Sequence, residues 1–167
     1  MESIALSQEY IKRGMVYTAL EECYNALDRS PTYLPIHRQI GQVLLSLGKT
    51  EEAVNKYVTI ANTYLARGNF HRAVAGYNRA LTLAPMDVTV RMKLINLLVS
   101  HGEIEEALAN YLSLADSYYQ MAQMDKARET YQEALKLAPR GTLGQQWMVR
   151  LLHKIGDLDM QHVDWKK

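Results

Sequence analysis

Few residues of this 167-residue chain have types and spacing suited to chemistry. His153 is close in sequence to Asp157 and Asp159, and imidazole and carboxylate groups are common zinc ligands. We interpret these three residues instead as the polar end of a helix. The sequence contains no HExxH pair, no GxxxxGK[ST] phosphate loop, no GxGxxG and no GxSxG. The histidines make no clustered ligand set in the sequence: His37, His71, His101, His153 and His162.

We therefore predict no catalytic residue, no cofactor and no metal site, and expect that the chain is not an enzyme. The net charge of +1 gives no indication that the chain binds nucleic acid or a membrane surface. Cys23 is the single cysteine, so an intramolecular disulfide cannot form. No secretory signal and no run of about 18 apolar residues is present. We expect a cytoplasmic protein with neither nucleic acid nor membrane as a partner.

The elements that must position any binding residue are set by an internal repeat. The segment from Tyr57 to Pro85 recurs 54 residues later, from Tyr111 to Pro139. Prolines and glycines keep the same step along the chain: Pro31, Pro85 and Pro139, and Gly48, Gly102 and Gly156. Several residue types that share one step indicate a repeat architecture.

Each repeat has the pattern of amphipathic helices, because apolar and small residues recur three and four positions apart. No strand-like alternation occurs. Glycine readily takes the left-handed conformation just past a helix end, so five glycines are expected to end helices: Gly14, Gly48, Gly68, Gly102 and Gly156. We predict helices at about 2–13, 16–29, 34–47, 50–67, 70–83, 88–101, 104–121, 124–137, 142–155 and 157–165. The short loops between them imply that consecutive helices are antiparallel.

The order of aromatic, small and proline residues in these helices follows a known pattern. One copy is formed by Tyr57, Ile60, Ala61, Tyr64, Gly68, Ala73, Tyr77, Ala80 and Pro85. The copy that starts at Tyr111 has Ala122 where glycine is expected, and the first copy has Cys23 at an aromatic position. This arrangement resembles the tetratricopeptide repeat family.

The resemblance implies an all-α fold, a right-handed superhelical solenoid of antiparallel helix pairs with about ten helices. We expect one domain over 1–167, with copies at about 1–34, 34–60, 54–87, 88–114, 108–141 and 142–167. A plain repeat of this family has 34 residues. The step of 54 is explained if Tyr57 and Tyr111 each serve two overlapping copies, so that neighbouring motifs share a helix.

Proteins of this family commonly hold an extended peptide or a partner helix on the concave face of the solenoid. Carried over by position, the predicted partner-binding residues are Arg38, Gln42, Asn62, Lys93 and Asn96, with Gln8, Asp116 and Gln120 as further candidates. Amides can bond a peptide backbone, and arginine or lysine can hold a carboxylate. The resemblance thus predicts a non-enzymatic module that binds a protein or peptide partner.

Two other functions remain open from the sequence. The array could be a regulatory or sensor module of a multidomain signalling or transcription protein, or it could self-associate through its end helices. Trp147 and Trp165 are expected either to close the final layer or, if the chain is cut from a longer repeat protein, to meet the next repeat.

Overall fold

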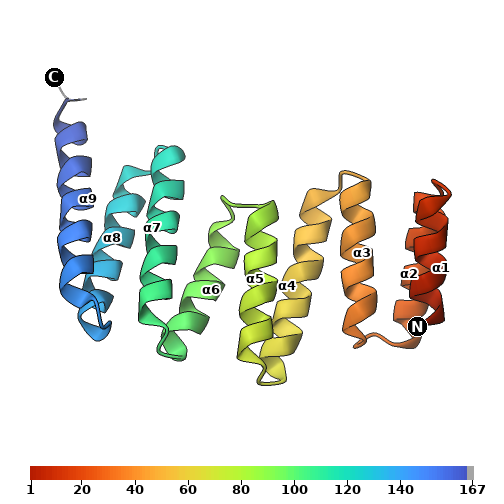
Figure 1. The fold of residues 1–167 in the computed structure, drawn as a ribbon. Coiled ribbons are helices and arrows are strands. Elements are labelled where there is room, and N and C mark those ends of the chain that lie inside the picture. The colour runs from red at the N-terminus through yellow and green to blue at the C-terminus, as the bar shows by residue number, and fades with distance from the viewer. Residues whose placement is uncertain (165–167) are drawn as a thin grey trace. The chain divides into compact units, whose positions relative to one another are not determined.

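The computed structural model describes residues 1–164 and the side chains of residues 1–161, so Trp165 lies outside the described residues. The described chain forms nine α-helices and one short 3-10 helix, with no strand among these residues. It divides into two compact units, Met1–Pro85 and Met86–Lys167. Within each unit, consecutive helices are antiparallel neighbours (Figure 1). The predicted all-α fold class of a helical repeat is confirmed.

The first unit contains α1 (Glu2–Lys12), α2 (Val16–Arg29), α3 (Leu34–Ser46), α4 (Thr50–Ala66) and α5 (Phe70–Leu83). The second unit contains α6 (Val88–Ser100), α7 (Ile104–Gln120), α8 (Met124–Leu137), the 3-10 helix η1 (Ala138–Arg140) and α9 (Gly144–Asp164). The bounds of the first eight helices agree with the predicted ones to within one residue. Because α2, α5 and α8 begin at residues 16, 70 and 124, their helical positions can be compared directly at a step of 54.

The end of the chain differs from the prediction. Helices were expected at 142–155 and 157–165, with a break at Gly156, but α9 runs without interruption from Gly144 to Asp164. Gly156 does not take the positive φ of a helix end. The apolar side chains Leu151, Ile155 and Leu158 continue one face of the helix through this point, and Leu151 and Leu158 are buried. Packing of this face therefore outweighs the helix-breaking tendency of one glycine.

Four of the predicted glycine ends are confirmed by a positive φ, at Gly14, Gly48, Gly68 and Gly102. Ala122, which replaces glycine in the α7–α8 turn, has a φ of 59°. The α4–α5 and α7–α8 turns share one hydrogen-bond pattern. Asn69 N donates to Tyr64 O and Gln123 N donates to Tyr118 O, and both distances are 2.9 Å. The alanine is therefore held in a conformation that L-residues with a side chain rarely adopt.

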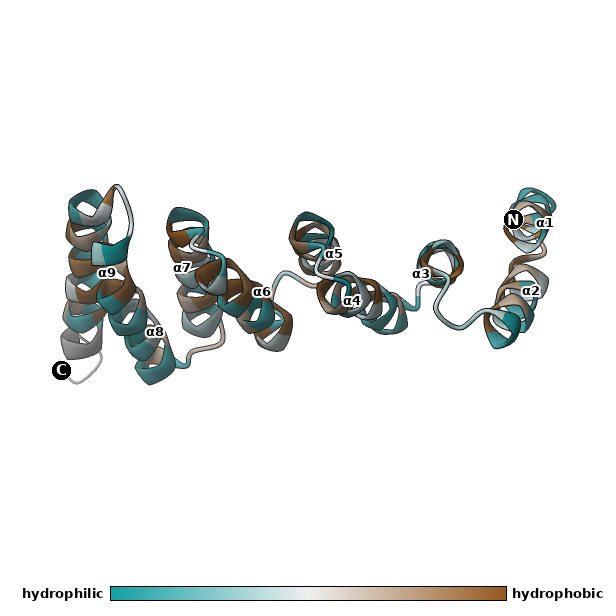
Figure 2. Cartoon of the chain, turned by 90° about the horizontal axis from the view of Figure 1, so that it is seen from below, coloured by the Kyte–Doolittle hydropathy of each residue, from teal (hydrophilic) through white to brown (hydrophobic). Residues whose placement is uncertain are grey.

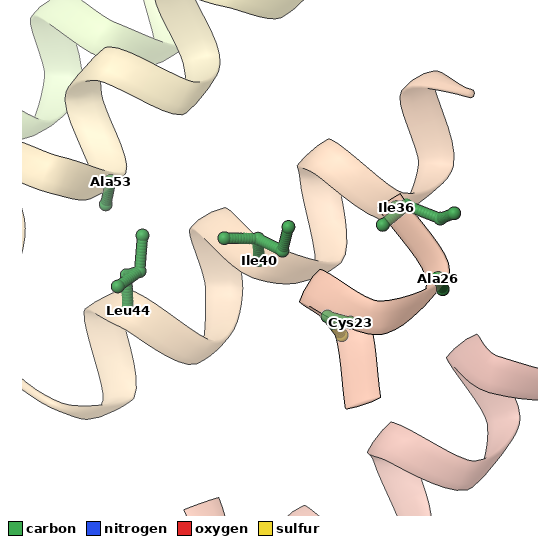
Figure 3. Packing of buried hydrophobic residues seen from close by; sticks show 6 residues of the cluster. All are labelled: Cys23, Ala26, Ile36, Ile40, Leu44 and Ala53. Carbon is green, nitrogen blue, oxygen red and sulfur yellow. The ribbon is translucent and has the colours of Figure 1, made fainter. Parts of the chain in front are cut away.

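The core of the first unit is built around α3, which has buried residues facing both of its neighbours. Figure 3 shows Cys23 and Ala26 of α2 near Ile36 and Ile40 of α3, and Leu44 of α3 pointing toward Ala53 of α4. Each of these side chains is at most 6% exposed. The hydrophobic and hydrophilic faces of the helices are visible in Figure 2. The wide apolar surface of α3 follows from contact with a helix on each side.

Helix α4 is also approached closely on both sides, by glycines of α3 and α5. A Cβ atom at Gly41 would lie 3.2 Å from the ring of Tyr57. A Cβ atom at Gly76 would lie 2.8 Å from Cβ of Ala61, closer than real Cβ atoms come. These two glycines let the backbones of α3 and α5 approach α4 closely. Longer side chains therefore lie at the edges of the two helix contacts.

Candidate functional site

A pocket of about 460 Å³ opens in the first unit where α3, α4 and α5 meet. We call it the α3–α5 pocket. It is lined by Pro35, Arg38, Tyr57, Ile60, Tyr64, Arg72, Ala75, Gly76 and Arg79. Three of these side chains carry a positive charge and none carries a negative charge.

The helical register explains how α4 and α5 place these residues. Tyr57, Ile60 and Tyr64 recur at three- and four-residue steps, so they lie on one face of α4. Arg72 and Arg79 are seven residues apart on α5, which is two helical turns or about 10 Å along the axis. The turn between the two arginines carries the small residues of the lining, Ala75 and Gly76. Ala75 is exposed and carries no long side chain, whereas Gly76 is buried against Ala61 of α4.

Each arginine of α5 lies over a tyrosine ring of α4. The guanidinium carbon of Arg72 is 5.4 Å from the ring centroid of Tyr64, and that of Arg79 is 5.6 Å from the ring centroid of Tyr57. The face of an aromatic ring attracts the cation, and the contact limits the conformational freedom of the arginine side chain. The N–H donors in the plane of a guanidinium remain available for an oxygen ligand.

Among the side chains that the structure describes, no anionic partner is found for the arginines of the pocket. Arg38, Arg72 and Arg79 are all exposed, and within the described residues none of them forms an ion pair. Charges of one sign that gather in a concave site raise the local concentration of ligands of the other sign. The arrangement can therefore hold an anionic group by charge-assisted hydrogen bonds.

Of the predicted partner-binding residues of the first unit, Arg38 lines this pocket, and Gln42 and Asn62 do not. Gln42 lines a separate pocket of about 330 Å³ between α1 and α3. The other residues of that pocket are Gln8, Ile11, Lys12, Gln39 and Ser46. Asn62 is two positions from both Ile60 and Tyr64, so it lies on the opposite side of α4, where its Oδ1 accepts a 2.6 Å hydrogen bond from the Tyr77 hydroxyl.

In the second unit, Lys93 and Asn96 are exposed on α6, and Gln120 is exposed at the end of α7. Asp116 accepts a 3.1 Å hydrogen bond from the hydroxyl of Tyr131. Burial raises the pKa of Tyr131, and the charge of Asp116 raises it further. Asp116 and Tyr131 line a pocket of about 210 Å³ with Tyr119, Lys154, Asp157, Leu158 and Gln161.

The sequence analysis did not select Arg72 and Arg79. The family pattern places binding residues mainly on the first helix of each pair, whereas α5 is a second helix. One signal in the sequence could have found Arg79: it aligns with Glu133 at the 54-residue step, so the charge at this position differs between copies.

The histidine and aspartates near the end of the chain are not brought together as ligands. Asp159 forms an ion pair with Arg128 of α8. In the described part of the chain, no group of three or more histidine, cysteine, aspartate and glutamate side chains could hold a metal ion. The side chain of His162 lies outside the described residues. No helix in that same part is long and apolar enough to span a bilayer.

Comparison with known families identifies the repeat. Residues 58–114 and residues 108–140 each match a model described as a tetratricopeptide repeat. Residues 58–140 of the chain consist of tetratricopeptide repeats. The two matches cover α5 to α8 and the part of α4 from residue 58 on, so they include Tyr64 of the α3–α5 pocket and begin directly after Tyr57. No curated protein matches this tetratricopeptide repeat chain.

Several solved structures are similar to this tetratricopeptide repeat protein. Repeats of a putative kinesin light chain from Podosopora anserina are 13% identical, with 98% of this chain and 95% of that chain covered and a TM-score of 0.44. A thermophilic repeat protein from Thermus thermophilus is 18% identical, with 90% and 97% covered and a TM-score of 0.32. YrrB, described as a repeat protein with an unusual peptide-binding site, is 16% identical, with 87% and 90% covered and a TM-score of 0.34.

Proposed function

We propose that this tetratricopeptide repeat chain is a non-enzymatic protein-interaction module, and that its first unit binds an extended or helical segment of a partner protein. The family supports an interaction or scaffold role in general. The observation that supports the finer proposal is the α3–α5 pocket, where Arg38, Arg72 and Arg79 stand exposed around a floor of tyrosine rings. Aromatic and arginine side chains are the types most enriched among residues that dominate binding energy.

The pocket would act as the anchor of a longer contact. Its volume of about 460 Å³ accommodates one or two side chains of a partner rather than a whole segment. The rest of the segment would lie across the neighbouring surface of α3, where the amide of Gln42 can donate and accept hydrogen bonds. For the second unit, Lys93 and Asn96 remain the predicted partner-binding residues.

Selection of peptides from a random 15-residue phage library with the purified chain tests this proposal. The selected peptides are expected to bind with one-to-one stoichiometry and to shift the backbone amide resonances of α3, α4 and α5. The double variant Arg38→Ala and Arg79→Ala should weaken binding by at least about tenfold, which corresponds to about 1.4 kcal/mol. Its control is Lys126→Ala with Glu133→Ala, two exposed positions of the second unit that correspond to Arg72 and Arg79. The absence of any selected peptide, or a footprint confined to α6–α9, would contradict the proposal.

Self-association through an end helix is a second candidate function, favoured by one feature of α9. Val149, Leu152 and Met160 are 61%, 54% and 71% exposed and lie on one face of this helix. Gly156 lies in the middle of the same face. Light scattering over a range of concentrations tests this candidate: a mass that stays at 19.1 kDa would exclude it, and a dimer lost in Val149→Asp would support it.

A further inference from the structure

We propose that the α3–α5 pocket recognises a phosphorylated side chain of the partner segment. This inference rests on the proposed function and names the chemical group that the segment carries. It is drawn from three features of the pocket: its charge, the type of its cations, and its difference from the same place in the second unit.

The charge of the pocket exceeds what one carboxylate balances. Arg38, Arg72 and Arg79 together bring three positive charges with no acidic residue in the lining. A carboxylate contributes one negative charge, whereas a phosphorylated serine, threonine or tyrosine contributes about 1.5 to 2 at neutral pH, together with three strong acceptor oxygens. The phosphoryl group is therefore the better electrostatic match.

The cations are also of the type that suits a phosphoryl group. A guanidinium presents a planar fork of N–H donors that can bond two phosphate oxygens at once, which a lysine ammonium cannot do. Tyr57 and Tyr64 hold Arg79 and Arg72 from one face, so less conformational entropy is lost when a ligand binds. The pocket of about 460 Å³, with the short, exposed side chain of Ala75 between the two arginines, leaves room for the group and for the side chain that carries it.

The second unit shows that this set of charges is not a general property of the repeat. At the 54-residue step, Arg38, Arg72, Ala75, Gly76 and Arg79 correspond to Met92, Lys126, Glu129, Thr130 and Glu133. The contact of a cation with a tyrosine is kept, since Lys126 lies 5.6 Å from the ring centroid of Tyr118. The other two arginines are replaced by one apolar residue, Met92, and one acidic residue, Glu133, and a second acidic residue stands at the position of Ala75. The repeat fold therefore does not require the three arginines, which favours a binding role for them.

Four degenerate nonapeptide libraries test the inference, with phosphoserine, phosphotyrosine, glutamate or serine fixed at the centre. Fluorescence anisotropy with the full chain measures the apparent Kd of each library. At least one phosphorylated library is expected to bind about tenfold more tightly than the glutamate and serine libraries. Inorganic phosphate alone, which offers the same group without a peptide, is expected to compete only weakly.

Variants at matched positions identify the site. Arg38→Met and Arg79→Glu introduce the residues found at the same positions of the second unit, and both replace exposed side chains. Each should abolish the preference for phosphorylated libraries, whereas Lys126→Glu in the second unit should preserve it. Circular dichroism checks that each variant keeps its helix content.

The outcomes separate this inference from the proposed function. If all four libraries bind equally and compete at the pocket, the peptide-binding function stands and the phosphoryl inference is overturned. If a preference for phosphate survives in both Arg38→Met and Arg79→Glu, the assignment to this pocket is overturned. If free phosphate binds as tightly as the phosphorylated libraries, the pocket takes a small anion rather than a partner. If no library binds, the proposed function itself fails.

Discussion

The hydroxyl of Tyr77 donates a 2.6 Å hydrogen bond to Oδ1 of Asn62, and the same pair recurs in the second unit as Tyr131 and Asp116 at 3.1 Å. Each bond joins the second helix of a pair to the first. We expect Tyr77→Phe and Tyr131→Phe to lower the free energy of unfolding by about 1 kcal/mol each, measured by urea denaturation. Tyr17→Phe is the control, because this side chain is 71% exposed, and it should change stability by less than about 0.5 kcal/mol.

The charge in the second pair gives a prediction for pH. Burial and the adjacent Asp116 raise the pKa of Tyr131, so the folded state favours the neutral phenol. The stability contributed by this group is present below the ordinary tyrosine pKa of about 10 and is lost as pH rises toward the folded pKa. Asp116→Asn removes one charge and should lower the pKa of Tyr131, as followed by NMR of labelled tyrosine. An unchanged pKa in that variant would mean that Asp116 does not contribute to the shift.

The left-handed conformation of Ala122 predicts the sign of the stability change when this residue is replaced. Ala122→Gly removes the strain of a Cβ atom at a φ of 59° and should stabilise the chain by about 0.5–1 kcal/mol. Gly68→Ala makes the reverse change at the same position of the α4–α5 turn, 54 residues earlier, where φ is 71°, and should destabilise by about 1 kcal/mol. Thermal unfolding measures both variants. Equal signs for the two variants would contradict this account of the turns.

Two glycines inside helices are predicted to respond in opposite directions. Gly76→Ala should destabilise the first unit by about 1–3 kcal/mol, because its Cβ atom would meet Ala61 and force α4 and α5 apart. Gly156→Ala should stabilise α9 by about 0.5–1 kcal/mol, because no atom lies within 4 Å of its Cβ position. Chemical denaturation checks both values. Destabilisation by Gly156→Ala would indicate that α9 bends at this residue in solution.

Glu105 of α7 accepts two hydrogen bonds from the loop that precedes α9. Its Oε1 accepts hydrogen bonds from Leu143 N at 3.1 Å and from the Thr142 hydroxyl at 3.0 Å. The bond from the Leu143 amide lowers the pKa of Glu105, and the hydroxyl of Thr142 adds to this effect. The stabilisation is present above the ordinary glutamate pKa of about 4.3 and is lost as pH falls through the lower folded pKa.

Hydrogen exchange at the Leu143 amide should therefore lose protection at acid pH in the wild type. Glu105→Gln keeps an acceptor oxygen but does not titrate, so the protection of the same amide should depend on pH only through the intrinsic exchange rate. Protection in the wild type that persists below the folded pKa of Glu105 would contradict this role for the carboxylate.

The sequence was sufficient for the helices of this chain but not for its pocket. The periodicity of apolar residues and the glycine signals placed the ends of α1 to α8, since these are local properties of the chain. The glycine signal wrongly predicted a helix end at Gly156, because the buried face made by Leu151 and Leu158 continues the helix through this residue. That face becomes visible only when α9 packs against its neighbours.

The α3–α5 pocket depends on tertiary relationships that one helix does not encode. Arg38 could be selected from its position in the family pattern. Arg72 and Arg79 join it because Gly76 lets α5 approach α4 closely and because the two helices are antiparallel, which sets each arginine over a tyrosine. Asn62 has a suitable residue type, but its place on the far side of α4 follows from the same helical register.

Photo-crosslinking at Ala75 tests most directly whether a partner segment occupies this pocket. The chain would carry p-benzoylphenylalanine in place of Ala75, an exposed residue of the lining, or in place of Glu129, its exposed counterpart in the second unit. With a peptide selected on the wild-type chain, irradiation should yield a covalent adduct at position 75 and none at position 129. Equal adducts at both positions, or an adduct at position 129 alone, would contradict the account.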